Sequence, residues 1–208
     1  MPAVPVTVVS DVVCPFCFIG AVRLERAIAT SGIEAQVRYA PFLLDPDTPR
    51  GGVDLRDRLR RKYGGDPAPM FARVEAMARA SGIPLDFGRV TLGVRTVSAH
   101  VLLAHAADKG TQAALAMSLF RAYFLEGRNI GEDDELVAVA EAHGFTAAEA
   151  RGLLQREDEE AAVRAEAQEA ARAGVTGVPF FVFGSRLAVA GAQEEATLVS
   201  ALQRAAQG

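Results

Sequence analysis

The sequence predicts an α/β fold in which a long helical block interrupts a single mixed β-sheet. Three observations lead to this prediction. Near the N-terminus, a β-rich run, a helical pattern and a second β-rich run follow one another. Helical spacing then fills the chain from about Leu55 to Ala173, and short β-runs return after Gly174. Because the period of the apolar residues distinguishes helices from strands, the expected order is β–α–β, a set of helices, then β–β–α.

The N-terminal unit begins with an apolar strand from Pro5 to Ser10. Helical spacing follows from Phe18 to Ile28 and ends near Gly32, a residue type suited to a helix C-terminus. Ala35 to Phe42 forms the second predicted strand. Two strands joined by one helix are expected to lie parallel, with a right-handed crossover.

The central block starts after a proline-containing loop from Leu44 to Gly52. Its predicted helices share apolar spacing of three and four residues, and most of the breaks between them contain glycine. They are Leu55–Tyr63, Met70–Ser81, Val97–Lys109, Ala113–Glu126, Asp134–His143, Ala147–Leu154 and Glu157–Arg172. No fixed period relates them, so a solenoid is not expected.

The C-terminal unit returns to β-structure. Two short runs, Pro179–Phe183 and Leu187–Ala190, are joined by the Gly184-Ser185 turn and predict an antiparallel hairpin. A last helix is predicted from about Gln193 to Ala206. Because each flanking piece alone has too few strands to be stable, the helical block is interpreted as an insertion. The predicted domains are 1–52 with 156–208, which form the sheet-containing domain, and 53–155, the helical insertion.

Composition places the chain among ordinary globular proteins. Its 208 residues are 50% hydrophobic and 23% charged, which excludes intrinsic disorder and low-complexity scaffolds. A formal net charge of −4 argues against nucleic acid or an anionic membrane as a partner, since both need clustered positive charge. The apolar runs are far shorter than the ~20 residues of a membrane-spanning helix, and the N-terminus lacks a secretory-signal pattern. We therefore expect a cytoplasmic protein.

The motif that carries chemistry is Cys14-Pro15-Phe16-Cys17, which contains both cysteines of the chain. A Cys-x-x-Cys pair where a strand becomes a helix, within a β–α–β unit, indicates a thioredoxin-like redox site. A sulfur in the first helical turn faces unpaired backbone N–H groups and the positive end of the helix dipole, which favour the thiolate. We predict that Cys14 is the nucleophile and that Cys17, one turn further, is the resolving cysteine. Pro15 suits the first helical position.

Two other interpretations apply to this pair of cysteines. The pair could be half of a structural zinc site, but no further cysteines exist, and the three histidines lack the spacing of a ligand pair. The cysteines could also be inert core residues, since free cysteine is often buried. The position between strand and helix favours redox chemistry over both.

Five separated segments carry a family resemblance that extends through nearly the whole chain: SDVVCPFCFIGAVRLERAI, VRYAPFLLDP, RTVSAHVLLAHAADKG, FRAYFLEGRNIGEDDELVAVAEAHGF and GVTGVPFFVFGSRLAVAGAQ. Together they resemble the DsbA-like thioredoxin family and, within it, the FrnE-type subfamily of disulfide oxidoreductases. The resemblance implies a thioredoxin fold with a four-stranded mixed sheet of order 2-1-3-4, antiparallel last strands and an inserted helical domain. It implies thiol–disulfide oxidoreductase or isomerase activity on protein or peptide substrates. No metal or organic cofactor is implied, because the Cys14–Cys17 pair is itself redox-active.

The resemblance adds a second site element, Val178-Pro179. In the family, the matching proline is cis and lies against the active-site sulfurs, and the residue before it pairs its backbone with the substrate. We therefore expect Val178 and Pro179 to bind substrate, together with Pro15 and Phe16 between the cysteines. The alternative is that Pro179 merely begins a strand.

The family also contains relatives of a different chemistry. Those similar to kappa-class glutathione transferases and hydroxychromene-carboxylate isomerases carry serine where this chain has Cys14, and they use it to hold or activate glutathione. A glutathione-dependent transferase or isomerase is thus the alternative function, and glutathione is the candidate co-substrate. A third hypothesis is a redox-sensing or chaperone-like binding protein whose disulfide switches a surface. The chain departs from its relatives in its Pro-Phe dipeptide and in lacking the additional C-terminal cysteine pair of some FrnE-type proteins.

Several other residues are candidates for structural or minor roles. Asp11, three residues before Cys14, could tune the nucleophile, although an aspartate after a strand is more often a turn residue. His100 is expected in the core or at an interface. A basic cluster is expected to be a solvated helix face: Arg56, Arg58, Arg60, Arg61 and Lys62. Four acidic residues suit the start of a helix: Glu157, Asp158, Glu159 and Glu160. Three aromatic residues are expected to pack in the core of the helical block: Phe120, Tyr123 and Phe124.

Overall fold

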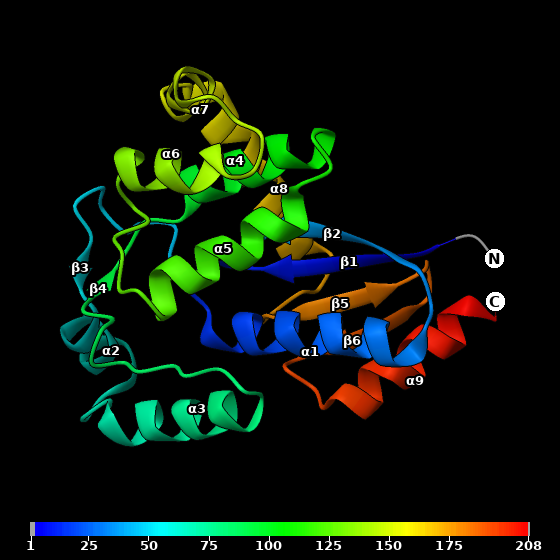
Figure 1. Cartoon of the computed structure of the whole chain (residues 1–208). Helices are drawn as coiled ribbons and strands as arrows, with labels where there is room; N and C mark the ends of the chain where they lie inside the picture. The colour runs from blue at the N-terminus through cyan, green and yellow to red at the C-terminus, as the bar shows by residue number, and fades with distance from the viewer. Residues whose placement is uncertain (1–2, 208) are drawn as a thin grey trace.

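The computed structural model describes residues 3–207, and its centre is a four-stranded sheet of order β2-β1-β5-β6 (Figure 1). The strands are β1 (Val4–Ser10), β2 (Ala35–Pro41), β5 (Phe180–Phe183) and β6 (Leu187–Ala190). β1 pairs parallel with β2 and antiparallel with β5, and β5 pairs antiparallel with β6. The predicted thioredoxin fold, its strand order and its antiparallel C-terminal hairpin are confirmed.

The central strand β1 is buried on both faces. Val6 and Val8 pack into the large core cluster on one face, whereas Val9 and Ala40 belong to a smaller cluster on the other. Successive side chains of a strand point to opposite faces. Ser10, the last residue of β1, is therefore on the same face as Val6 and Val8.

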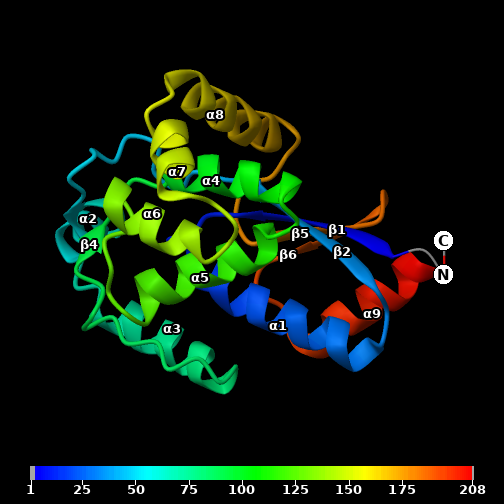
Figure 2. The same ribbon diagram turned by 45° about the horizontal axis from the view of Figure 1, so that its top comes forward.

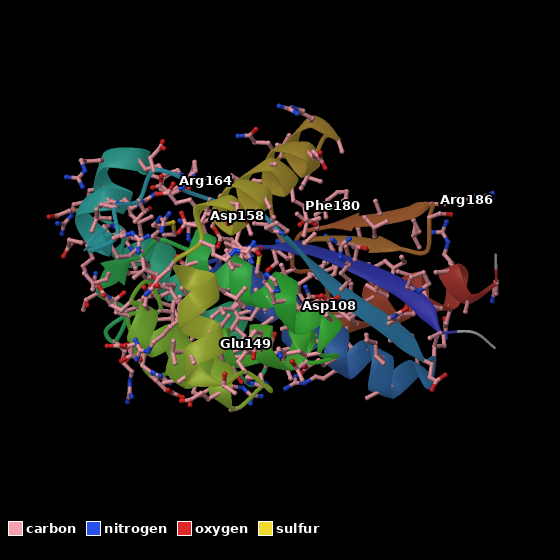
Figure 3. All side chains as sticks on the ribbon, turned by 90° about the horizontal axis from the view of Figure 1, so that it is seen from above. Asp108, Glu149, Asp158, Arg164, Phe180 and Arg186 are labelled. Carbon is pink, nitrogen blue, oxygen red and sulfur yellow. The ribbon has the colours of Figure 1, made fainter. Side chains whose placement is uncertain are left out.

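Two helices cover the face of the sheet toward which Val6 and Val8 point. They are α1 (Pro15–Ser31) and α9 (Glu195–Ala206), which lie side by side beneath the sheet in Figures 1 and 2. α8 (Glu157–Arg172) lies near the opposite face. Figure 3 shows this helix, marked by Asp158 and Arg164, passing near Phe180 of β5. The sheet is thus enclosed between two helical layers.

The remaining elements form the helical block. Its helices are α2 (Leu55–Tyr63), α3 (Ala68–Ala80), α4 (Val97–Asp108), α5 (Gln112–Phe124), α6 (Asp133–Glu141) and α7 (Ala147–Leu154). Each matches a predicted helix within about two residues at either end. A second sheet of two-residue strands, β3 (Val53–Asp54) and β4 (Leu92–Gly93), was not predicted, because strands this short contain no readable period.

The start of α1 is fixed against the helical block by aromatic packing. Phe18 stacks on Phe120 and Phe124 of α5, with ring centroids 5.4 and 5.9 Å apart. These side chains and Tyr123 are buried, which confirms the predicted aromatic core of the block. One hydrophobic cluster thus continues from the sheet into the block, and the domain boundaries at 52/53 and 155/156 stay a prediction.

A buried arginine holds the middle of α1. The Arg23 guanidinium donates to Ser81 Oγ at 2.9 Å and to the carbonyl of Ala192 at 2.9 Å, and it pairs with Glu194 at 3.0 Å. It therefore ties α1 both to the end of α3 and to the segment before α9.

None of the helices within residues 3–207 combines the length and the apolar character that a membrane-spanning helix needs.

Candidate active site

Cys14 lies at the N-terminal end of α1, as predicted. Its carbonyl accepts hydrogen bonds from the backbone N–H groups of Cys17 and Phe18 at 3.0 and 3.2 Å, so the helix begins at this residue. Pro15 occupies the first helical position, where its missing N–H costs no hydrogen bond. The Cys14 sulfur is therefore beside the unpaired N–H groups and the positive dipole end of the helix.

The Val178-Pro179 segment lies against this sulfur. The Val178-Pro179 peptide bond is cis, and the Cys14 thiol donates to the Val178 carbonyl at 3.7 Å. Gly20 allows the close approach of this segment to α1, because a Cβ atom at Gly20 would lie 3.0 Å from ring atoms of both Pro179 and Phe181. The structure thus brings Cys14 and the predicted cis-proline segment together from positions 164 residues apart.

Cys17 is almost completely enclosed, with 1% of its surface exposed. Burial raises the pKa of the Cys17 thiol well above its ordinary value, and the neighbouring Cys14 acts in the same direction. The two cysteines are both reduced in this structure. Cys17 therefore carries its proton at neutral pH and must lose it before it can attack a disulfide.

The raised pKa of Cys17 predicts how stability depends on pH. Above about pH 8.5, where cysteine ordinarily titrates, the unfolded chain releases this proton while the folded chain keeps it. Because the folded state then binds more protons, we expect the free energy of unfolding of the reduced protein to fall as the pH rises. Urea unfolding of the reduced wild type and of Cys17→Ala at several alkaline pH values measures this effect.

Two buried tyrosines, Tyr39 and Tyr123, also lower the free energy of unfolding as the pH rises, because burial raises the pKa of each. Their effect begins at higher pH than that of Cys17. The comparison with Cys17→Ala removes their contribution, since both proteins retain them. The decline should be shallower in the variant. Equal declines in the two proteins would contradict the assignment to Cys17.

Asp11 and His100 form a buried pair next to the cysteines. Asp11 Oδ1 lies 3.3 Å from His100 Nε2, and Asp11 Oδ2 accepts from the backbone N–H of Leu44 at 2.8 Å. Asp11 has no exposed surface and His100 is 5% exposed. His100 is on α4, so this pair connects the end of β1 to the helical block. The predicted placement of His100 in the core is confirmed, but its partner was not predicted.

A cavity of about 310 Å³ opens beside Cys14. The predicted residues Asp11, Cys14, Pro15, Phe16 and Val178 all line it, whereas Pro179 is not among its lining residues and lies close to Gly20 of α1. This volume is at the lower end of the range for small-molecule sites. The nucleophile therefore faces a hollow between the sheet and the helical block, and Phe16, 38% exposed, stands at its edge.

The far wall of the cavity comes from the helical block and was missed at the sequence level. Its apolar part includes Leu55, Leu59, Met70, Phe71, Phe87 and Tyr123. Arg58 and Lys62 of α2 also line it. Arg60, Arg61 and Lys62 are exposed, as expected of a solvated helix face, whereas Arg58 is half-buried. Arg58 pairs with Asp45 and donates to Thr48 Oγ1 at 2.8 Å. One sequence signal could have indicated this wall. Leu55 and Leu59 are four residues apart, as are Arg58 and Lys62, so each pair lies on one face of the helix and the two faces are adjacent.

Metal binding gains no support from the arrangement of ligands. In the described part of the chain, residues 3–207, no three His, Cys, Asp or Glu side chains gather in a way that could hold a metal ion. The cysteine pair therefore lacks, within those residues, the further ligands that a structural zinc site needs.

A family model described as the DSBA-like thioredoxin domain matches residues 5–203. The chain belongs to this DsbA-like thioredoxin family. The probable DsbA oxidoreductase SCO1869 of Streptomyces coelicolor is 32% identical, with a TM-score of 0.87 over 98% of this chain and 90% of that one. YwbO, an uncharacterized protein of Bacillus subtilis, is 29% identical over 87% of each chain.

A more distant likeness is to DsbM, a cytosolic disulfide reductase of Pseudomonas aeruginosa solved with glutathione. It is 21% identical, with a TM-score of 0.66 over 98% of this DsbA-like chain and 96% of DsbM, and this likeness shows the fold. The predicted family and a general oxidoreductase role are confirmed. Membership of the FrnE-type subfamily stays a prediction.

Proposed function

We propose that this DsbA-like protein catalyses thiol–disulfide exchange on protein or peptide disulfides, with Cys14 as nucleophile and Cys17 as resolving cysteine. The observation that supports this most is the position of the Cys14 sulfur. It lies at the N-terminus of α1, 3.7 Å from the Val178 carbonyl, with the protonated Cys17 thiol one helical turn behind it. A helix N-terminus stabilises the attacking thiolate, and a second thiol in reach completes the exchange.

The reaction has two displacement steps. The Cys14 thiolate attacks one sulfur of a substrate disulfide, forms a mixed disulfide and releases the other sulfur as a thiolate. Cys17 then loses its proton and attacks the Cys14 sulfur, which breaks the mixed disulfide. The enzyme pair ends oxidised to a Cys14–Cys17 disulfide, and the substrate ends as two thiols that have taken up the protons. The reverse sequence oxidises a dithiol substrate.

The surrounding residues have proposed roles in binding. The Val178 backbone pairs with the substrate backbone, and Pro179 holds that segment against α1. Pro15 and Phe16 contact the substrate at the edge of the cavity. Asp11 tunes the site through its pair with His100, because both are buried and Asp11 also lines the cavity.

The cavity supports a second candidate, a glutathione-dependent transferase or isomerase in which Cys14 activates the glutathione thiol. A hollow of about 310 Å³ suits a small peptide better than a protein surface. Its wall carries both signs of charge, Arg58 and Lys62 together with Asp11 and Asp45, and Asp45 pairs with Arg58. Glutathione is also the ligand named for DsbM. In this reaction Cys17 would have no covalent part.

Three assays run side by side on the same preparation test the proposal: insulin reduction, reactivation of scrambled ribonuclease, and conjugation or isomerisation that depends on glutathione. We expect activity in the first two, and loss of both on replacement of either cysteine. Glutathione-dependent activity that survives Cys17→Ser, without disulfide exchange, would favour the second candidate. A redox-sensing protein without turnover would be inactive in all three.

We also propose that the protein works in the cytoplasm, as DsbM is described as doing. A reducing compartment suits a protein whose cysteines form only the active-site pair, because structural disulfides are rare there.

A further inference from the structure

Ser10 is a buried hydroxyl that has no hydrogen-bond partner of regular geometry in this structure. It is 3% exposed, and within residues 3–207 its Oγ is the one buried side-chain oxygen or nitrogen that has no partner. Burying a hydroxyl without a hydrogen bond is unfavourable, and nearly all buried polar groups in native proteins are paired. A group that departs from this rule next to an active site is a candidate for a role in the reaction.

The side chain of Ser10 points toward the start of α1. Ser10 ends β1 on the same face as Val6 and Val8, which pack in one core cluster with Cys17. The chain turns tightly after it, since the Cys14 N–H donates to the Asp11 carbonyl at 3.0 Å. Ser10 therefore lies on the face of the sheet that α1 covers, near the first turn of α1, where Cys17 is buried. The pKa of Cys17 agrees with this placement: burial has the largest effect and raises it, whereas the Ser10 side chain and the Asp11 backbone lower it.

We propose that the Ser10 hydroxyl donates a hydrogen bond to the Cys17 thiolate while Cys17 resolves a mixed disulfide at Cys14. A neutral thiol is a poor acceptor, which explains why Oγ is unpaired in the reduced protein. The thiolate is a charged acceptor, and a hydrogen bond to a charged group is about twice as strong as one between neutral groups. The hydroxyl thus favours the form of Cys17 that reacts.

The step is balanced without any further reactant. The Cys17 proton leaves, the Cys17 thiolate forms a bond to the Cys14 sulfur, and the bond from Cys14 to the substrate sulfur breaks. The substrate sulfur takes the electron pair and then a proton, so it is reduced as the cysteine pair is oxidised. The titratable group that acts on the pKa of Cys17 is Cys14 on α1, and Cys17 in turn raises the pKa of Tyr39 on β2. The Asp11 carboxylate bonds to His100 and Leu44.

The inference rests on the proposed exchange reaction, and dithionitrobenzoate separates its two steps. In excess reagent, attack by Cys14 releases one coloured thiolate, and resolution by Cys17 releases a second at a rate independent of reagent concentration. We expect Ser10→Ala to slow the second release by roughly tenfold to a hundredfold, the range for loss of one hydrogen bond to a charge. The first release should stay within about twofold of the wild type.

Ser10→Thr, which keeps the hydroxyl, should restore the second release, and Ser200→Ala, which removes an exposed hydroxyl from α9, should change neither release. In a Cys14→Ala background, Ser10→Ala should also shift the ionisation of Cys17, followed by thiolate absorbance, to higher pH. If the second thiolate is released at the wild-type rate in Ser10→Ala, or as slowly in Ser10→Thr as in Ser10→Ala, the role of Ser10 is wrong while the proposed function stands. A wild type that never gives a second release would instead overturn the proposed function.

Discussion

Cys14→Ser is expected to lower the rate of insulin reduction by at least about a thousandfold, because a serine hydroxyl cannot replace the attacking thiolate at neutral pH. Cys17→Ser is expected to stop turnover in a different way. It keeps the Cys14 thiolate but lacks the thiol that resolves the mixed disulfide, so substrate proteins should stay bound through Cys14. Non-reducing gels of the two variants, expressed in the same cells, measure this difference.

The two serine variants serve as matched controls for each other, since each removes one sulfur from the same helical turn. Bands that disappear on adding reductant should accumulate with Cys17→Ser alone. Equal trapping by both variants, or by neither, would contradict the assignment of nucleophile and resolving cysteine. Retained activity of Cys14→Ser would rule out the exchange mechanism itself.

The second large effect is expected at Gln112, a buried side chain that links the helical block to the edge of the sheet. Gln112 Oε1 accepts from the Tyr39 N–H at 2.8 Å, and Nε2 donates to the carbonyls of Tyr39 and Leu103, both at 3.0 Å. Gln112→Ala would leave the Tyr39 N–H and carbonyl without this partner in a buried place, at about 1–3 kcal/mol for each group that water cannot reach. We expect a loss of about 3 kcal/mol in the free energy of unfolding.

Urea unfolding of Gln112→Ala measures this loss, with Gln168→Ala as the control. Gln168 is exposed on α8, so its replacement should change the free energy of unfolding by no more than about 0.5 kcal/mol. A loss below about 1 kcal/mol at Gln112 would mean that water or a rearranged edge strand satisfies the Tyr39 groups.

Local sequence signals were sufficient for the sheet, the main helices and the position of Cys14. The period of apolar residues and the glycines at helix ends depend on neighbours in the chain, so the structure reproduces most predicted elements within about two residues. The contact between Cys14 and Val178, by contrast, came only from the family resemblance. No local pattern connects residues that are 164 positions apart.

The parts of the site that were not predicted all depend on distant packing. The pairing of Asp11 with His100 spans 89 positions, and each residue alone has a common structural explanation. Arg58 and Lys62 belong to a charged helix whose sequence pattern is that of a solvated face. They line the cavity because the fold brings α2 and Cys14 to the same hollow. Ser10 could not be distinguished from any serine that ends a strand until its burial and lack of a partner were known.

The most direct test of the central claim is the redox equilibrium of the Cys14–Cys17 pair in glutathione buffers, with mass spectrometry of the alkylated protein at each ratio. We expect one two-electron transition between a form with two alkylated cysteines and a form with an intramolecular Cys14–Cys17 disulfide. Cys14 should be the site of the minor glutathione adduct. A protein that accumulates a stable glutathione adduct at Cys14 with Cys17 still free, or that keeps both thiols in oxidising buffer, would contradict the proposed mechanism.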